Sequence, residues 1–110
     1  HDNETLLGWL GSIKPAEAEY VANYVSGELM DKEDLVYRII RAVQGSHARC
    51  CIIPLQDYLC LNNKARINTP STLGKNWMWR LKDGELTSAL SKRILTMTRL
   101  FGRVSDTALE

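Results

Sequence analysis

The apolar run from Cys50 to Leu55 restricts the fold of this chain more than any other feature of its sequence. The run is short, partly β-branched and closed by Pro54, which is typical of a strand buried on both faces. Such strands usually lie in parallel sheets, where each strand needs a neighbour. No second convincing strand occurs elsewhere in the sequence. We therefore expect one buried strand near 50–55 in an incomplete α/β fold that lacks its partner strands.

Four other segments have the apolar spacing and the end signals of helices. Asn3 is expected to cap the first, Pro15 to begin the second, and Thr87 to cap the last. The third is expected between Asp31 and Gly45. Turn residues mark the long stretch 56–84 as a loop, with a turn or two of helix at 56–61. Helices, one strand, a long loop and a final helix are the order expected at the end of an α/β barrel.

The balance of charges points to an uncharged partner. The chain carries 14 Lys and Arg against 13 Asp and Glu, a formal charge of +1. No global field would attract nucleic acid or anionic lipid, whereas a neutral sugar fits. The apolar runs are far shorter than the about 18 residues of a membrane span, and no signal peptide is visible. We therefore expect no nucleic-acid partner and no membrane partner.

The three cysteines indicate the compartment. Cys50, Cys51 and Cys60 form an odd set, and two of them lie in the apolar run. Buried free thiols in a reducing compartment are expected, which favours a cytoplasmic location. Adjacent cysteines on a strand point to opposite faces, so they are poorly placed to share a metal ion. We expect no metal site and no cofactor.

The first residue suggests that the chain is part of a longer protein. A natural reading frame begins with Met, whereas this sequence begins with His1. We expect a fragment with a missing N-terminal portion, and a tail at residues 105–110.

Three stretches of sequence carry a family resemblance. They are His1-Asp2-Asn3-Glu4-Thr5 with Gly8-Trp9, Ile53-Pro54-Leu55-Gln56-Asp57, and Ala65-Arg66-Ile67-Asn68-Thr69-Pro70 with Asn76-Trp77-Met78-Trp79-Arg80-Leu81. Together they resemble the amylomaltase, or 4-alpha-glucanotransferase (disproportionating enzyme), family of the alpha-amylase clan. The resemblance implies that residues 1–104 are the C-terminal part of a catalytic (β/α)8 barrel. They would hold the elements after its seventh strand, including the last strand and helix.

The resemblance also implies roles for five residues. Asp2 would be the carboxylate that stabilises the transition state, and His1 would hydrogen-bond the same sugar. Asn68, Thr69 and Pro70 would form a substrate-binding loop on the acceptor side of the cleft. The nucleophilic Asp and the acid/base Glu of the family would lie upstream of this chain.

The implied chemistry explains why the fragment alone is expected to be inactive. Retaining transfer needs two carboxylates about 5 to 5.5 Å apart, and a third cannot replace either. The parent enzyme would transfer α-1,4-glucan segments between maltooligosaccharides with retention of configuration. We expect the fragment to bind its missing portion or to self-associate. The alternatives are an α-glucosidic hydrolase of the same clan and a helical interaction module without chemistry.

Several residues near the motifs have two interpretations. Trp77 and Trp79 could stack on sugar rings, but we favour an anchor for the long loop. Asp57 follows the predicted strand, where a barrel places functional groups, but we expect it to cap the helical turn after it. Arg66 is expected to hold a loop carboxylate or the backbone, and it is left outside the site.

Overall fold

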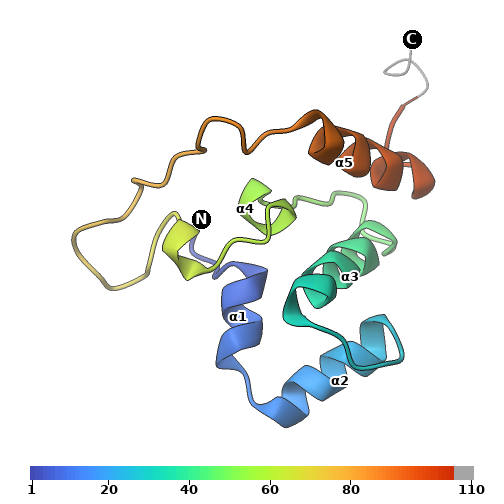
Figure 1. The fold of residues 1–110 in the computed structure, drawn as a ribbon, viewed down its shortest axis with the longest axis horizontal. Helices are drawn as coiled ribbons and strands as arrows, with labels where there is room; N and C mark the ends of the chain where they lie inside the picture. Colours follow the sequence, from blue (N-terminus) through green and yellow to red (C-terminus); the bar gives the residue numbers. More distant parts are fainter. Residues whose placement is uncertain (106–110) are drawn as a thin grey trace.

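The computed structural model describes residues 1–105, and every regular element in that range is a helix (Figure 1). The elements are α1 (Leu6–Ser12), α2 (Pro15–Val25), α3 (Lys32–Gln44), α4 (Leu55–Tyr58), the 3-10 turn η1 (Asn63–Ala65) and α5 (Ser88–Leu100). Within this range no helix is long and apolar enough to cross a bilayer. Of the expected tail at 105–110, residues 106–110 lie outside the described part.

Helix α3 is the centre of the fold. It packs against α1, α2, α4 and α5, and its apolar stripe faces inward because leucine, valine and isoleucine recur on one side. The buried core is formed by Leu10, Ala22, Leu35, Val36, Ile40 and Met97. The predicted boundaries are confirmed, since Asp31 is the residue before the helix and Gly45 is the residue after it.

Local signals correctly predict most helix ends. Pro15 is the first residue of α2, and the Thr87 hydroxyl accepts a hydrogen bond from the Leu90 N–H at 3.1 Å. The prediction for α1 is wrong by two residues. Thr5, not Asn3, caps this helix, and its hydroxyl is buried against the first turn.

The predicted strand at 50–55 and the α/β fold class are wrong. Residues 50–54 have no regular structure, Leu55 already begins α4, and no strand occurs among residues 1–105. Hydrogen bonds of a strand are made with other segments, and the described chain offers no extended segment to pair with this one. The run is not buried either, because Ile52 is 84% exposed and Cys50 is exposed. The chain as described is therefore all-helical.

A long irregular segment from residue 66 to Thr87 connects η1 to α5. Figure 1 shows it leaving the helices, turning back and rejoining them at α5. Its start lies beside the N-terminus, which places the sequence motif around Asn68 next to the motif around Asp2. This meeting of two distant motifs creates the candidate site.

Candidate functional site

The N-terminal segment, residues 2–6, lies along residues 57–68 and is joined to them by a series of hydrogen bonds that we call the clasp. The series begins at the Leu6 N–H, which donates to Asp57 Oδ1 at 2.8 Å. It ends at Asp2, whose side chain bonds Asn68, 66 residues further along the chain. Because the clasp fixes the segment that carries the first motif, it determines where the candidate catalytic residues lie.

Asp57 holds the start of α1 and not the start of α4. The expectation that it caps the turn after it is wrong, because α4 has Pro54 at its cap and no side-chain capping bond. The Asp57 carboxylate instead accepts from Leu6, the first residue of α1. Burial raises the pKa of Asp57, and the Leu6 N–H only partly opposes this by favouring the charged form. Its role is to fix the position of α1.

Asn63 is the middle of the clasp and was not singled out from the sequence. Its Oδ1 accepts from the Thr5 N–H at 3.1 Å and the Thr5 hydroxyl at 3.3 Å, while Nδ2 donates to Glu4 Oε1 at 2.9 Å. The side-chain amide fills the place that a Cβ at Gly8 would occupy. The glycine in the first motif therefore allows close approach of α1 to Asn63.

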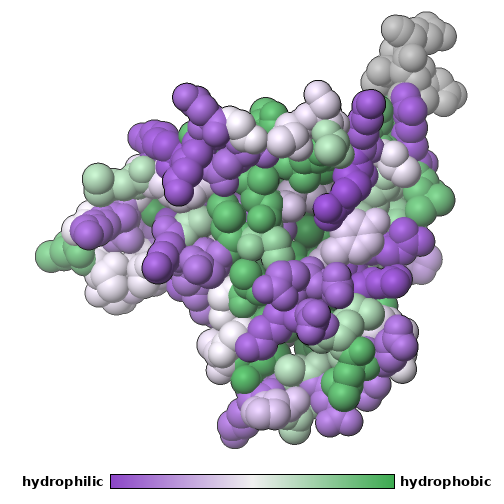
Figure 2. All heavy atoms as spheres, in the orientation of Figure 1, coloured by the Kyte–Doolittle hydropathy of each residue, from purple (hydrophilic) through white to green (hydrophobic). Residues whose placement is uncertain are grey.

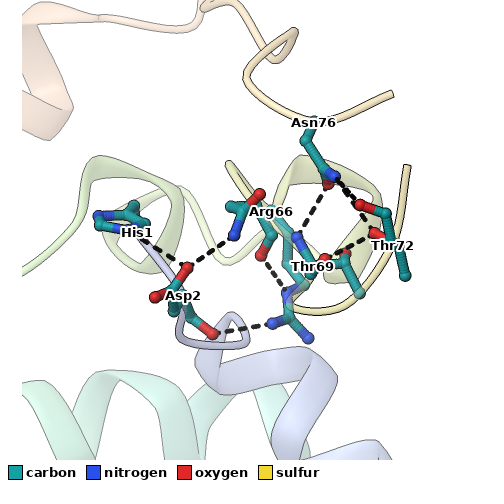
Figure 3. A network of polar contacts seen from close by, with 7 residues as sticks. His1, Asp2, Arg66, Thr69, Thr72 and Asn76 are labelled. Carbon is teal, nitrogen blue, oxygen red and sulfur yellow. Dashed lines mark hydrogen bonds and ion pairs between the residues drawn. The ribbon is translucent and has the colours of Figure 1, made fainter. Parts of the chain in front are cut away.

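Asp2 meets Asn68 and His1 at the open end of the clasp (Figure 3). The Asn68 Nδ2 donates to Asp2 Oδ1 at 2.7 Å, and the His1 Nε2 lies 3.3 Å from the same oxygen. The His1 and Asp2 side chains are 53% and 55% exposed. The structure thus brings together three of the five predicted site residues and leaves the Asp2 carboxylate accessible.

Arg66 binds backbone oxygens at this place, which is one of the two roles expected for it. Its Nη2 donates to the Asp2 carbonyl oxygen at 2.8 Å and its Nε donates to the Asn68 carbonyl oxygen at 3.2 Å. The guanidinium therefore joins the two motif segments directly.

Thr69 and Pro70 follow Asn68 at the start of the long loop. The Thr69 N–H donates to Asn76 Oδ1 at 2.9 Å, and the Asn76 amide donates to Thr72 (Figure 3). Both Thr69 and Pro70 are exposed. These bonds give the loop its own shape, and the substrate-binding role of the two residues stays a prediction.

Trp77 anchors the long loop and also lies beside His1. The backbone N–H of Trp77 donates to the Ile67 carbonyl oxygen at 2.6 Å. The φ angle of Trp77 is 63°, in the left-handed region that non-glycine residues seldom adopt. The indole centroid is 4.8 Å from the imidazole centroid of His1, and the indole is 56% exposed. The backbone bond anchors the loop without the indole, so it does not test the favoured interpretation of the ring, which remains accessible to a ligand.

A cavity of about 470 Å³ opens next to His1, between α1, α3 and the segment before α4. Its wall is largely apolar and includes Ile39, Ile40, Ile52, Ile53 and Ile67. Asp57 and Arg66 are among the residues that add polar groups to the wall. Figure 2 shows hydrophobic surface gathered in the middle of one face of the molecule, around α4. Apolar surface of this kind is typical of an area that another polypeptide covers.

The clasp holds three carboxylates, and they differ in what they can do. Glu4 and Asp57 accept hydrogen bonds from Asn63 and Leu6, which commits them to the fold. Asp2 is exposed and held in one orientation by the Asn68 amide. An oriented, accessible carboxylate can accept hydrogen bonds from a bound ligand and can stabilise positive charge that develops beside it.

Comparisons with known proteins agree on one family. The 4-alpha-glucanotransferase family model matches residues 1–87. A 4-alpha-glucanotransferase from Streptococcus pneumoniae is 37% identical over the whole chain, and one from Clostridium butyricum is 42% identical over 94% of it. A solved structure, amylomaltase from Streptococcus agalactiae in complex with acarbose, matches 96% of the chain with a TM-score of 0.87 and 27% identity.

The matched proteins are much longer than this chain. The chain spans 22% of the Streptococcus pneumoniae relative, 21% of the Clostridium butyricum relative and 21% of the Streptococcus agalactiae chain. It therefore corresponds to about a fifth of each.

Proposed function

We propose that this chain, which belongs to the 4-alpha-glucanotransferase family, is the C-terminal part of an enzyme that transfers α-1,4-glucan segments between maltooligosaccharides with retention of configuration. Residues 1–104 would form the last part of its catalytic domain. The chain alone would be inactive, because retaining transfer needs a nucleophilic carboxylate and an acid/base carboxylate that the family supplies from upstream. The Streptococcus agalactiae amylomaltase was solved in complex with acarbose, and this supports a carbohydrate as the substrate.

The arrangement of Asp2 and Asn68 carries this proposal. A hydrogen bond of 2.7 Å between side chains 66 residues apart orients an exposed carboxylate. In the proposed role, Asp2 accepts hydrogen bonds from ring hydroxyls, and these bonds strengthen as the sugar becomes more like an oxocarbenium ion. His1 would bind the same sugar, and Asn68, Thr69 and Pro70 would approach the acceptor.

The test uses the full-length enzyme that contains this chain, incubated with maltotriose. We expect longer maltooligosaccharides from the wild type. Asp2→Asn removes the charge and keeps the shape, and the lost stabilisation of several kcal/mol should lower kcat by at least about a hundredfold. Asp83→Asn is the matched control, because Asp83 is exposed in a turn outside the clasp, and it should keep wild-type kcat.

Two outcomes would contradict the proposal. If the wild type forms only maltose and glucose, the enzyme passes the sugar to water and is a hydrolase. If Asp2→Asn is as active as Asp83→Asn, then Asp2 does not stabilise the transition state.

The expected macromolecular partner is the missing portion of the same enzyme. The apolar cavity beside α3 and the 84% exposed Ile52 support this proposal, because such surface favours burial. The relatives extend well beyond the part that this chain matches. Without that portion we expect self-association. Sedimentation of the chain alone and with the upstream portion checks both expectations, since a chain that stays monomeric and does not bind would contradict them.

A cytoplasmic location remains a prediction. It rests on the three cysteines, which are free thiols in the structure. The expected burial is wrong for Cys50, which is exposed, while Cys51 and Cys60 are partly buried. Relatives from Arabidopsis thaliana and Solanum tuberosum are named as chloroplastic or amyloplastic proteins, so the family also occurs in plastids.

A further inference from the structure

Arg66 lies where the two segments that carry the proposed site residues meet. One guanidinium group joins the carbonyl oxygen of Asp2, at 2.8 Å, to the carbonyl oxygen of Asn68, at 3.2 Å. The same two residues meet again through their side chains at 2.7 Å. Figure 3 shows the arginine beside Asp2. Backbone and side chain of Asp2 are thus fixed separately relative to Asn68.

The backbone of Arg66 is also held in place. The Arg66 backbone N–H donates to the Asn63 carbonyl oxygen at 3.2 Å, which ties this residue to the middle of the clasp. The preceding residue, Ala65, is 4% exposed, and its carbonyl oxygen accepts from Gln56 Nε2 at 3.3 Å. Because the guanidinium is planar and its donors have fixed directions, its two hydrogen bonds hold the two carbonyl groups in a defined position relative to each other.

The Arg66 side chain donates its hydrogen bonds to carbonyl oxygens. Each of these bonds is made to a backbone oxygen of a proposed site residue, Asp2 or Asn68. The arginine therefore does not occupy the polar side-chain atoms of these two residues. The Asp2 carboxylate keeps 55% exposure, so the arginine does not cover the place where a sugar would bind. The arrangement is suited to holding a geometry.

We infer that Arg66 is a positioning residue for Asp2, and that it sets the direction of the Asp2 carboxylate through the two backbone carbonyls without touching the sugar. The inference rests on the proposed function of Asp2. A misplacement of about 1 Å can lower a rate by about a hundredfold, so loss of this link should appear in kcat.

The experiment measures kcat and KM for maltotriose transfer in the full-length enzyme. Arg66→Ala should lower kcat by about tenfold to a hundredfold and change KM by less than about threefold, because ground-state binding is largely kept. Arg66→Lys should lower kcat less than Arg66→Ala does, because the ammonium group keeps the charge. It should still lower kcat relative to the wild type, because an ammonium group cannot hold two carbonyls in the same fixed geometry. Guanidinium ion at low millimolar concentration should restore part of the kcat of Arg66→Ala.

Arg103→Ala is the matched control. Its guanidinium also links distant carbonyls, donating to Gln44 at 2.8 Å and to Ala48 at 2.9 Å, but it lies at the end of α3, away from Asp2. This variant should lose stability, keep wild-type kcat and gain nothing from guanidinium.

Several results would overturn the inference. One is a wild-type kcat in Arg66→Ala, and another is an equal kcat loss in Arg103→Ala, which would indicate general destabilisation. If Arg66→Ala does not fold, Arg66→Lys decides, because a lowered kcat at unchanged melting temperature supports positioning and an unchanged kcat refutes it. Asp2→Asn separates the two proposals. An active Asp2→Asn refutes the role of Asp2, whereas an inactive Asp2→Asn with an active Arg66→Ala refutes only the role of Arg66.

Discussion

Replacing Gly8 by alanine should have opposite effects depending on whether Asn63 is present. Gly8 lies in α1, where alanine is favoured over glycine by up to about 1 kcal/mol. A Cβ at this position would overlap the side-chain amide of Asn63, which is held by Thr5 and Glu4 and cannot easily move away. The substitution therefore sets helix propensity against overpacking.

The magnitudes follow from these contacts. Overpacking costs about 1 to 3 kcal/mol, so Gly8→Ala alone should destabilise the fold by about 1 kcal/mol after the propensity gain. Asn63→Ala should cost about 1 to 3 kcal/mol, because the N–H of the 4% exposed Thr5 loses its acceptor. In the Asn63→Ala background the overlap is gone, and Gly8→Ala should stabilise by up to about 1 kcal/mol. The coupling between the two positions is then about 2 kcal/mol.

The assay is urea unfolding of the chain at a concentration where sedimentation shows it to be monomeric, followed by far-ultraviolet circular dichroism, for the wild type, both single variants and the double variant. Gly11→Ala is the control in the same helix. A Cβ at Gly11 meets no atom within 4 Å, so this variant should be as stable as the wild type or more stable. The reasoning is refuted if Gly8→Ala stabilises the wild type as Gly11→Ala does, or if its effect is the same with and without Asn63.

Three further predictions concern single positions, each measured by urea unfolding. Burial raises the pKa of Asp57, so the folded state binds its proton more tightly than the unfolded state, and the stability from this group is lost as pH rises from about 4 through the raised pKa. Asp57→Asn keeps an oxygen for the Leu6 N–H and cannot ionise, so its stability relative to wild type should rise from pH 4 to pH 7, and a constant difference would contradict this. Leu10→Ala should cost about 2 to 5 kcal/mol because Leu10 is 1% exposed, and a loss below about 1 kcal/mol would show that the core is not packed as described. Thr87→Ala should cost about 1 kcal/mol, which is more than Asp31→Ala should cost, because Thr87 makes a side-chain capping bond and Asp31 does not.

The helices could be predicted because their signals are local. Pro15 and Gly45 mark ends by their own backbone preferences, and the spacing of Leu35, Val36 and Ile40 fixes the buried face of α3. The error at 50–55 has the opposite cause. A strand depends on hydrogen bonds to other segments, and the sequence already showed no second strand to provide them. The missing partner was evidence against the strand in this chain.

The site could be predicted only in part, because its contacts link positions far apart in sequence. Family resemblance, not local pattern, assigned Asp2 and Asn68 to one site, and the structure places their side chains 2.7 Å apart. Asn63 carried no local signal. The one available indication was Gly8, since a glycine inside a helical segment is typical of close approach by another group. The expectation that Asp57 caps the helical turn after it was wrong, because its carboxylate accepts a hydrogen bond from the Leu6 N–H, 51 residues away in sequence.

The clasp closes a chain segment of 58 residues between Thr5 and Asn63, and Gly27 lies within that segment on an open turn between α2 and α3. Nothing lies within 4 Å of the place where a side chain at Gly27 would begin. Because the entropy of closing a loop grows only with the logarithm of its length, adding about a dozen residues there should weaken the closure by only about 0.2 kcal/mol. A peptide epitope of that length inserted after Gly27 should therefore leave the geometry around Asp2 unchanged.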